Sequence, residues 1–123
     1  MGAALKEARR SLRTFFDAYV APKPNQNSLL LNVLFENDGT REHIWVADIN
    51  ASVFPLQETI ANEPGIEGLS FKQRVSIHPS RIRGWMFVQD GYLIGGYTTK
   101  AIRASLTLAE TLKYDESARF KFK

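Results

Sequence analysis

Apolar side chains recur at intervals of three and four over the first 20 residues, and from residue 28 onward the spacing becomes that of strands. The apolar stripe of the first segment consists of Leu5, Ala8, Leu12, Phe15, Phe16 and Tyr19. This spacing places them on one face of a helix, opposite several cations. We therefore predict an amphipathic helix over residues 3–20, which ends before Pro22 because proline disfavours helical geometry in the residue before it.

The region 28–97 predicts a sheet of about six strands, because short apolar runs alternate there with turn-forming residues. Pro55 lacks the amide hydrogen that a strand donates to its neighbour, so we expect the third strand to lie at an edge or to carry a bulge. The stretch "HPSRI", which begins at His78, predicts a single helical turn with His78 or Ser80 near its start.

Asp90 and Gly91 lie between the runs "GWMFVQ" and "YLIGGY" and are the clearest hairpin signal in the chain. A two-residue type I′ turn needs positive φ at both positions, which suits this pair. The resulting register places Trp85 opposite Gly96. We expect Gly96 to leave room for the indole of Trp85, while Gly95 lets the strand bend. Anion binding on the bare amides of the two glycines is the alternative, although the spacing differs from that of a phosphate loop.

A second apolar stripe near the C-terminus consists of Ile102, Leu106, Ala109 and Leu112. It predicts one helix over residues 98–114, with Thr98 or Thr99 as its cap. Residues 115–123 are expected to form a frayed or loosely docked tail. Together, the elements predict a single α+β domain over residues 1–123. Its sheet is bent, mainly antiparallel and of about six strands, with the N-terminal amphipathic helix packed on it and the second helix near the C-terminus.

Composition places the chain among ordinary globular domains. It has 123 residues and no cysteine, which suits one domain without disulfides and a reducing, cytoplasmic location. No run approaches the ~18 apolar residues of a membrane span, so we expect no membrane association. The net charge of +3 is mild and disfavours nucleic-acid binding. Cations nevertheless gather near both ends of the chain, at Lys6, Arg9, Arg10, Arg13, Arg119, Lys121 and Lys123.

Candidate catalytic groups are few. His43 and His78 are the only histidines, and no serine lies in a G-x-S-x-G motif. A zinc site needs three or four ligands, so we expect neither a metal nor a cofactor. His43 and Trp45 share a strand face, and the loop "ANEPG" at 61–65 presents Asn62 and Glu63. These four residues are candidates for a binding surface, with half-buried packing and turn formation as the alternative roles.

Four segments resemble, in this order, the YegJ-like bacterial family, a domain family of unknown function (family 2314). They are "EARRSLRTFFDAY", "LLLNVLFENDGTREHIWV", "TIANEP" and "RVSIHPSRIRGWMFVQDGYLIGGYTT". Gly84 and Gln73 stand where family members commonly carry acidic residues. The resemblance implies no established activity. It does imply a binding module, because family members occur alone or fused to interaction repeats.

We therefore expect a small cytoplasmic bacterial protein that binds another protein without catalysis, as an immunity-type protein does when it covers a toxin surface. The candidate surface consists of His43, Trp45, Asn62, Glu63, Trp85, Tyr97 and Thr98. The alternative is a small-ligand-binding protein or an enzyme, with a pocket near His43 and the 61–65 loop. In an enzyme, His43 and a carboxylate such as Glu42 or Glu63 would have to converge within hydrogen-bonding reach. The sequence leaves the oligomeric state open.

Overall fold

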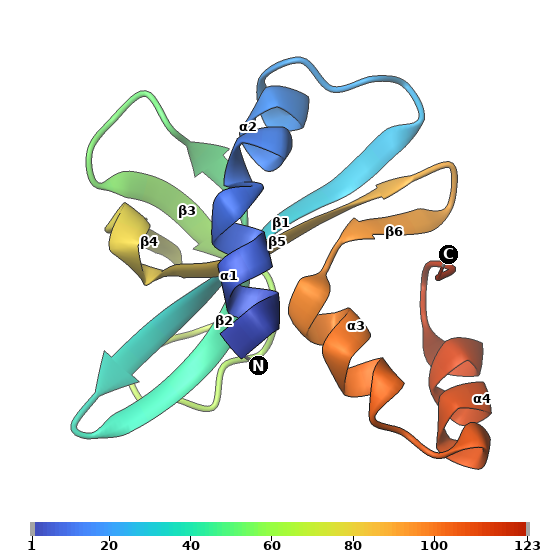
Figure 1. Ribbon diagram of the computed structural model, residues 1–123. Helices are drawn as coiled ribbons and strands as arrows, with labels where there is room; N and C mark the ends of the chain where they lie inside the picture. Colours follow the sequence, from blue (N-terminus) through green and yellow to red (C-terminus); the bar gives the residue numbers. More distant parts are fainter. Residues whose placement is uncertain (1, 123) are drawn as a thin grey trace. The chain divides into compact units, whose positions relative to one another are not determined.

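The computed structural model describes residues 2–122, which contain four α-helices, one 3-10 turn and six strands (Figure 1). In chain order the elements are α1 (Gly2–Arg10), α2 (Leu12–Val20), β1 (Gln26–Asn37), β2 (Thr40–Asn50), β3 (Leu56–Ile60), β4 (Arg74–Ile77), η1 (Pro79–Arg81), β5 (Ile82–Gln89), β6 (Tyr92–Gly95), α3 (Tyr97–Ala104) and α4 (Leu108–Ser117). The sheet has the strand order β4-β3-β2-β1-β5-β6, and the pairs β1–β2, β2–β3, β3–β4 and β5–β6 are antiparallel. The predicted α+β fold class is confirmed.

The chain divides into two compact units. The terminal unit comprises Met1–Leu29 and Gly84–Lys123, and the central unit comprises Leu30–Arg83. The terminal unit therefore carries all four α-helices and the β5–β6 turn, whereas the central unit carries β2, β3 and β4.

The N-terminal helix that we predicted as one element is two helices, which meet at Ser11. The hydroxyl of Ser11 donates a hydrogen bond to the carbonyl of Glu7 at 2.6 Å. A serine that bonds in this way to the carbonyl four residues earlier competes with the helical ladder and bends the chain. The apolar stripe still packs on the sheet as predicted, since the ring of Phe15 is fully buried and lies 6.3 Å from that of Trp85 on β5.

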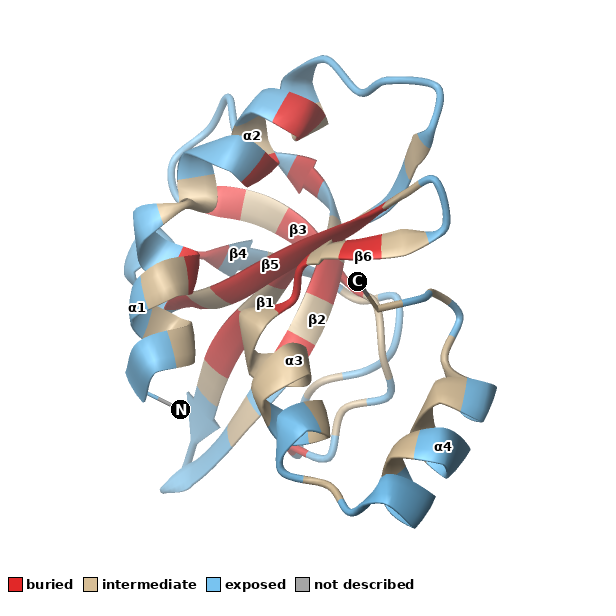
Figure 2. Ribbon diagram, turned by 45° about the vertical axis from the view of Figure 1, so that its right-hand side comes forward, coloured by how far each residue is buried: buried red, intermediate tan, exposed pale blue. Residues whose placement is uncertain are grey.

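The β5–β6 hairpin has the predicted register, and Asp90 (φ 53°) and Gly91 (φ 82°) both have positive φ. β5 is buried along most of its length (Figure 2). The glycine beneath the indole is Gly95, however, and not Gly96 as predicted. A Cβ at Gly95 would lie 2.5 Å from ring carbons of Trp85. The chain already turns out of the strand at Gly95, so that Gly96 (φ 59°) becomes the N-cap of α3.

The C-terminal helix that we predicted as one element is also two helices, α3 and α4. Thr107 and Glu110 form a reciprocal capping box at the start of α4. The Thr107 hydroxyl accepts from the Glu110 amide at 3.2 Å, and the Glu110 carboxylate accepts from the Thr107 amide at 2.9 Å. Such a box begins a new helix because it satisfies amides that have no partner within the helix.

Of the tail predicted over 115–123, residues 115–117 belong to α4, and the segment after α4 is docked rather than frayed. Lys121 forms a parallel bridge with Tyr92 of β6. Its amide donates to the carbonyl of Gly91 at 2.8 Å, and its carbonyl accepts from the amide of Leu93 at 2.9 Å. The local spacing gives no sign of this contact, because it joins residues that lie far apart in the chain.

The central unit is built on a long antiparallel β1–β2 ladder, which runs from Leu31 opposite Val46 to the turn at Asn37 and Thr40. β3 pairs with β2 on one side and β4 on the other. The prediction of β3 as an edge strand is therefore wrong. Pro55 lies immediately before β3 and takes no position in its ladder, and the irregularity is a register shift on β2, between Ala47 and Asn50.

Candidate functional site

Four of the predicted contact residues belong to the central unit, and three belong to the terminal unit. The first group is His43, Trp45, Asn62 and Glu63, and the second is Trp85, Tyr97 and Thr98. Their surroundings differ, because the first group lies on a strand and a loop and the second lies in the core and at the start of α3.

Trp85 is not part of a contact surface, because only 1% of it is exposed. Its ring packs against those of Phe15 and Tyr97, at centroid distances of 6.3 and 5.8 Å. Its indole Nε1 donates to the carbonyl of Ala8 at 3.2 Å, which satisfies the polar group of an otherwise apolar side chain. Trp85 is thus a core residue that joins β5 to the N-terminal helices.

Tyr97 and Thr98 are half-buried residues in the first turn of α3. Tyr97 meets Trp85 edge to face, and its hydroxyl lies 3.5 Å from that of Ser11. We predicted Thr98 or Thr99 as the cap of this helix, but Gly96 occupies that position. These two residues support the helix start and the core beside it.

His43 and Trp45 lie two positions apart on β2, and they therefore share one face of the sheet. His43 is exposed and stands opposite Leu34 of β1, whereas Trp45 is half-buried and stands opposite Asn32. The structure thus places an exposed imidazole and a half-buried indole on the same face of β2.

The 61–65 loop is tied to β2 by Asn62. The side-chain oxygen of Asn62 accepts from the amide of Trp45 at 2.6 Å, and its nitrogen donates to the carbonyl of Glu63 at 3.2 Å. The backbone adds a second link, since the amide of Ala61 donates to the carbonyl of Trp45 at 2.8 Å. Asn62 therefore shapes the loop, and the exposed Glu63 is the loop residue available to a partner.

Glu42 ties the other end of the same loop to β2. Its carboxylate accepts from the amide of Gly65 at 2.8 Å and from that of Ile66 at 3.1 Å. Glu42 precedes His43 in the strand and so points to the opposite face. Within residues 2–122, His43 forms no hydrogen bond with a carboxylate. The role of Glu42 as an anchor for the loop was missed by sequence reasoning.

Glu58 on β3 is a buried carboxyl group that sequence reasoning also missed. It is 0% exposed, and neither of its oxygens has a hydrogen-bond partner among the described residues. Burial raises its pKa to about 7, and the charge of Arg74 opposes this shift. The strand alternation contains the signal, because Glu58 occupies the same face as the buried Leu56 and Ile60.

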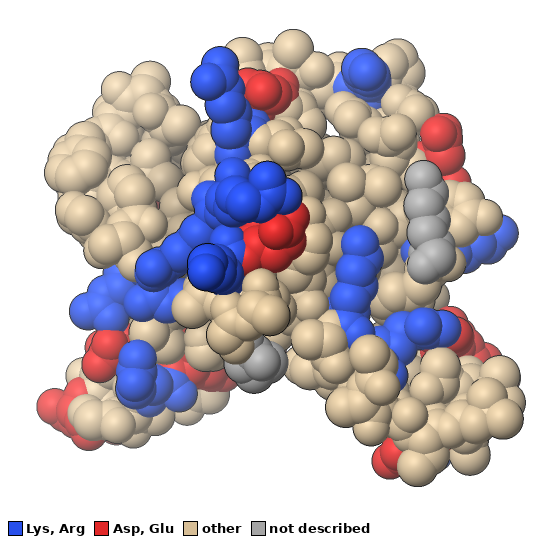
Figure 3. All heavy atoms as spheres, viewed as in Figure 1, with Lys and Arg blue, Asp and Glu red and all other residues tan. Residues whose placement is uncertain are grey.

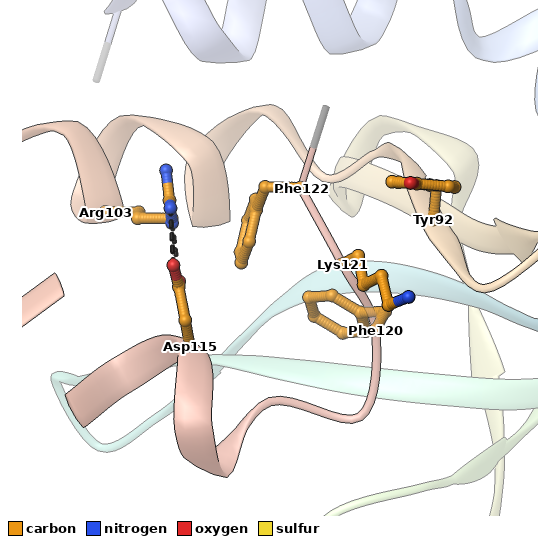
Figure 4. Close-up of a pocket in the computed structure, with 6 residues that line it drawn as sticks. All are labelled: Tyr92, Arg103, Asp115, Phe120, Lys121 and Phe122. Atoms are coloured by element: carbon orange, nitrogen blue, oxygen red, sulfur yellow. Dashed lines mark hydrogen bonds and ion pairs between the residues drawn. The ribbon is translucent and has the colours of Figure 1, made fainter. Parts of the chain in front are cut away.

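The terminal unit contains a hollow of about 310 Å³ between α3, α4 and the docked tail (Figure 4). Its lining consists of Tyr92, Arg103, Asp115, Phe120, Lys121 and Phe122. Arg103 donates two hydrogen bonds to Asp115, at 2.7 and 2.6 Å, and its guanidinium lies 4.4 Å from the ring centroid of Phe122. Arg103 and Asp115 in the lining of this hollow thus neutralise each other's charge.

Lys and Arg side chains gather over α1 and α2, with acidic groups among them (Figure 3). Glu7 forms an ion pair with Arg10, and Asp17 lies 3.9 Å from Arg13. These contacts offset part of the positive charge that gathers on this helix face. In the part of the chain that the structure describes, no helix is long and apolar enough to cross a membrane, and no cluster of three His, Cys, Asp or Glu side chains is placed to hold a metal ion.

The fold and the loop geometry define a small α+β module that presents a fixed loop beside a strand. The chain belongs to the bacterial family described as "Uncharacterized protein conserved in bacteria (DUF2314)", whose model matches residues 1–122. The predicted family is therefore confirmed.

Two curated relatives show where the similarity extends. The chain is 28% identical over 99 residues to the uncharacterized protein YegJ of Escherichia coli (strain K12). The aligned part covers 80% of this chain and 63% of that relative. It is 31% identical over 91 residues to a putative ankyrin repeat protein, NMB1133/NMB1171, of Neisseria meningitidis serogroup B, which covers 70% of this chain and 36% of the relative. The chain thus spans less than two thirds of either relative. No solved structure matches it.

Proposed function

We propose that this protein is a cytoplasmic bacterial module that binds another protein, without catalysis, through one face of the central unit. We define the β2 surface as His43, Trp45 and Glu63. An immunity-type role, in which this surface covers a toxin, is one form of the proposed function. A histidine, a tryptophan and a carboxylate suit protein contact, because an aromatic ring provides apolar area while polar groups fix orientation.

The observation that supports this proposal best is the attachment of the 61–65 loop to β2 at both ends. Asn62 bonds to the amide of Trp45, and Glu42 bonds to those of Gly65 and Ile66. A loop that is already fixed loses little conformational entropy when a partner binds. A fixed loop on a rigid sheet is also where proteins commonly place their binding residues.

The experiment is a copurification of the tagged, full-length protein from its native bacterium, with mass spectrometry of whatever is retained. We expect a protein partner. The substitution Trp45→Ala should reduce its recovery roughly 30-fold, as for a tryptophan at the centre of an interface. The exposed Glu63→Lys should also weaken binding, and it tests the same surface without removing a half-buried ring.

Phe71→Ala is the matched control, because Phe71 is an exposed aromatic residue in the same unit but outside the β2 surface. Its partner recovery should equal that of the unmodified chain. Full recovery with both Trp45→Ala and Glu63→Lys would contradict the proposed surface. Recovery of a small molecule without any protein would instead support the alternative of a ligand-binding protein or an enzyme.

A further inference from the structure

The segment from Tyr97 to Ser117 contains neither glycine nor proline, and its apolar spacing is that of one continuous helix. The chain nevertheless folds it as two helices, with a turn at residues 105–107. Ser105 closes α3 through a bond from its hydroxyl to the carbonyl of Ile102 at 2.6 Å, and Thr107 opens α4 with its capping box. The same residues can therefore satisfy their backbone in two ways, either as a turn or as uninterrupted helix.

The two helices differ in how firmly they are held. α3 packs against α1, and its Tyr97 packs against the core residue Trp85. Neither helix has a fully buried residue, but no comparable core contact among the described residues holds α4, and its Leu108 and Leu112 are 77% and 63% exposed. We define the C-terminal arm as residues 108–122. The arm is thus an extension of a well-anchored helix that contributes little to the core of its own chain.

Three contacts hold the arm to the rest of the terminal unit. The first is the Arg103–Asp115 ion pair, whose side chains are 30% and 37% exposed. The second is the contact of Lys121 with the β5–β6 hairpin, where it makes two backbone hydrogen bonds, to Gly91 and Leu93, and its ammonium lies 6.0 Å from the ring centroid of Tyr92. The third is the stacking of Arg103 on Phe122. The ion pair is bidentate but partly exposed, and no residue of the arm is buried, so the arm adds little apolar burial to the fold of its own chain.

We propose that the C-terminal arm exchanges between two copies of this chain. In the exchanged form, α3 and α4 join into one helix, and each arm places its Lys121 against Tyr92 of the other copy. A second copy is the occupant that fits, because it supplies the same groups for all three contacts and needs no new complementary surface. Two such exchanges close a two-fold dimer. The inference does not depend on the proposed function, since no arm residue belongs to the β2 surface.

Engineered cysteines test the exchange directly, because the chain has none of its own. The double variant Tyr92→Cys/Lys121→Cys should form a disulfide within one chain, which shows that the two positions can be bridged. The single variants Tyr92→Cys and Lys121→Cys are then mixed and oxidised at a concentration where light scattering detects the mass of two chains. They should form a heterodimer with a disulfide between position 92 of one chain and position 121 of the other. A mass of one chain at every concentration, or dimers without this link, would overturn the proposal.

Variants at the turn provide a second test in the full chain. Thr107→Ala removes the cap that favours the turn, so the dimer association constant should rise roughly fivefold. Leu106→Gly disfavours the joined helix at a position that lies in the turn, so the constant should fall by a similar factor. Thr111→Ala is the control, because position 111 is helical in both forms. Shifts in opposite directions support the exchange, whereas no shift or shifts in the same direction would overturn it.

Discussion

Trp85 lies against a backbone segment that carries no side chain. A Cβ at Gly95 would overlap the indole and would also lie 2.7 Å from the carbonyl of Trp85. The positive φ of Gly95 adds a second requirement for glycine, because other residues pay a steric cost in that conformation. A large ring is thus buried where the neighbouring strand leaves space for it.

Gly95→Ala should therefore destabilise the protein by more than the cost of its backbone conformation alone. Gly39 supplies that reference, because its φ is +80° and a Cβ there would meet open space. We expect Gly39→Ala to cost about 1 kcal/mol and Gly95→Ala to cost at least about 2 kcal/mol more, because Trp85 must shift. Urea unfolding of both variants measures the difference. Equal costs would contradict the packing of the indole on Gly95.

Glu58 predicts a pH dependence of stability. The folded state holds the proton of Glu58 up to a pH of about 7, whereas the ordinary carboxyl value is 4.5. Between these values the folded state binds more protons than the unfolded state, so stability falls as the pH rises. The stabilisation is fully present below pH 4.5 and is lost as the pH passes about 7. At 1.36 kcal/mol per pH unit, it amounts to at most about 3 kcal/mol.

Glu58→Gln should remove this dependence, because glutamine has no proton to lose. The measurement is the free energy of unfolding of both proteins in urea between pH 5 and 8, with Glu63→Gln as an exposed control. We expect the variant to gain stability over the unmodified chain as the pH rises. A constant difference across this range would show that the pKa of Glu58 is not raised in the folded state.

At the scale of elements, the attachment of the 61–65 loop to β2 depends on one amide side chain. Asn62→Ala leaves the amide of Trp45 without its acceptor and should destabilise the protein by about 1–3 kcal/mol. Asn62→Asp keeps an acceptor oxygen and should restore most of the loss. Hydrogen exchange at Trp45 and urea unfolding measure both effects. Unchanged exchange in Asn62→Ala would contradict the role of this residue as an anchor.

The sequence predicted elements where local chemistry decides the conformation. The Asp90-Gly91 turn fixes its own backbone, so the hairpin register followed from two residues. His78 likewise caps the short turn at η1, where its Nδ1 accepts from the amide of Ser80 at 3.1 Å. The two helix breaks were missed, because Ser11 and Thr107 also fit inside the apolar periodicity of a continuous helix. The choice between the two depends on side-chain hydrogen bonds that spacing does not encode.

The candidate site was predicted less completely than the fold. The sequence identified His43, Trp45 and the 61–65 loop, because aromatic side chains and turn residues carry a local signal. It could not show that Trp85 is in the core, since a tryptophan suits an interface and an interior equally well. The roles of Glu42 and the C-terminal tail depend on partners 23 or more residues away, which no local pattern specifies.

At the scale of the whole molecule, the mild net charge of +3 limits electrostatic binding. Strong binding to DNA requires several phosphate contacts and falls steeply with salt. Two of the N-terminal cations, Arg10 and Arg13, already face carboxylates. The full-length chain should therefore form no retained complex with duplex DNA at about 150 mM salt, as measured by fluorescence anisotropy. A complex that persists there, and whose affinity falls with the sixth power of salt or more steeply, would instead support nucleic-acid binding.

The hydrogen bonds of Asn62 and Glu42 fix the two ends of the 61–65 loop, on either side of its exposed tip at Glu63. The identity of residue 63 can then vary without altering the path of the chain, because its side chain takes no part in those bonds. Under the proposed function, substitutions at the tip change recognition, while Glu42 on β2 and Asn62 at the start of the loop keep the path of the chain the same. The same separation makes the loop a place to insert a foreign recognition sequence between fixed ends.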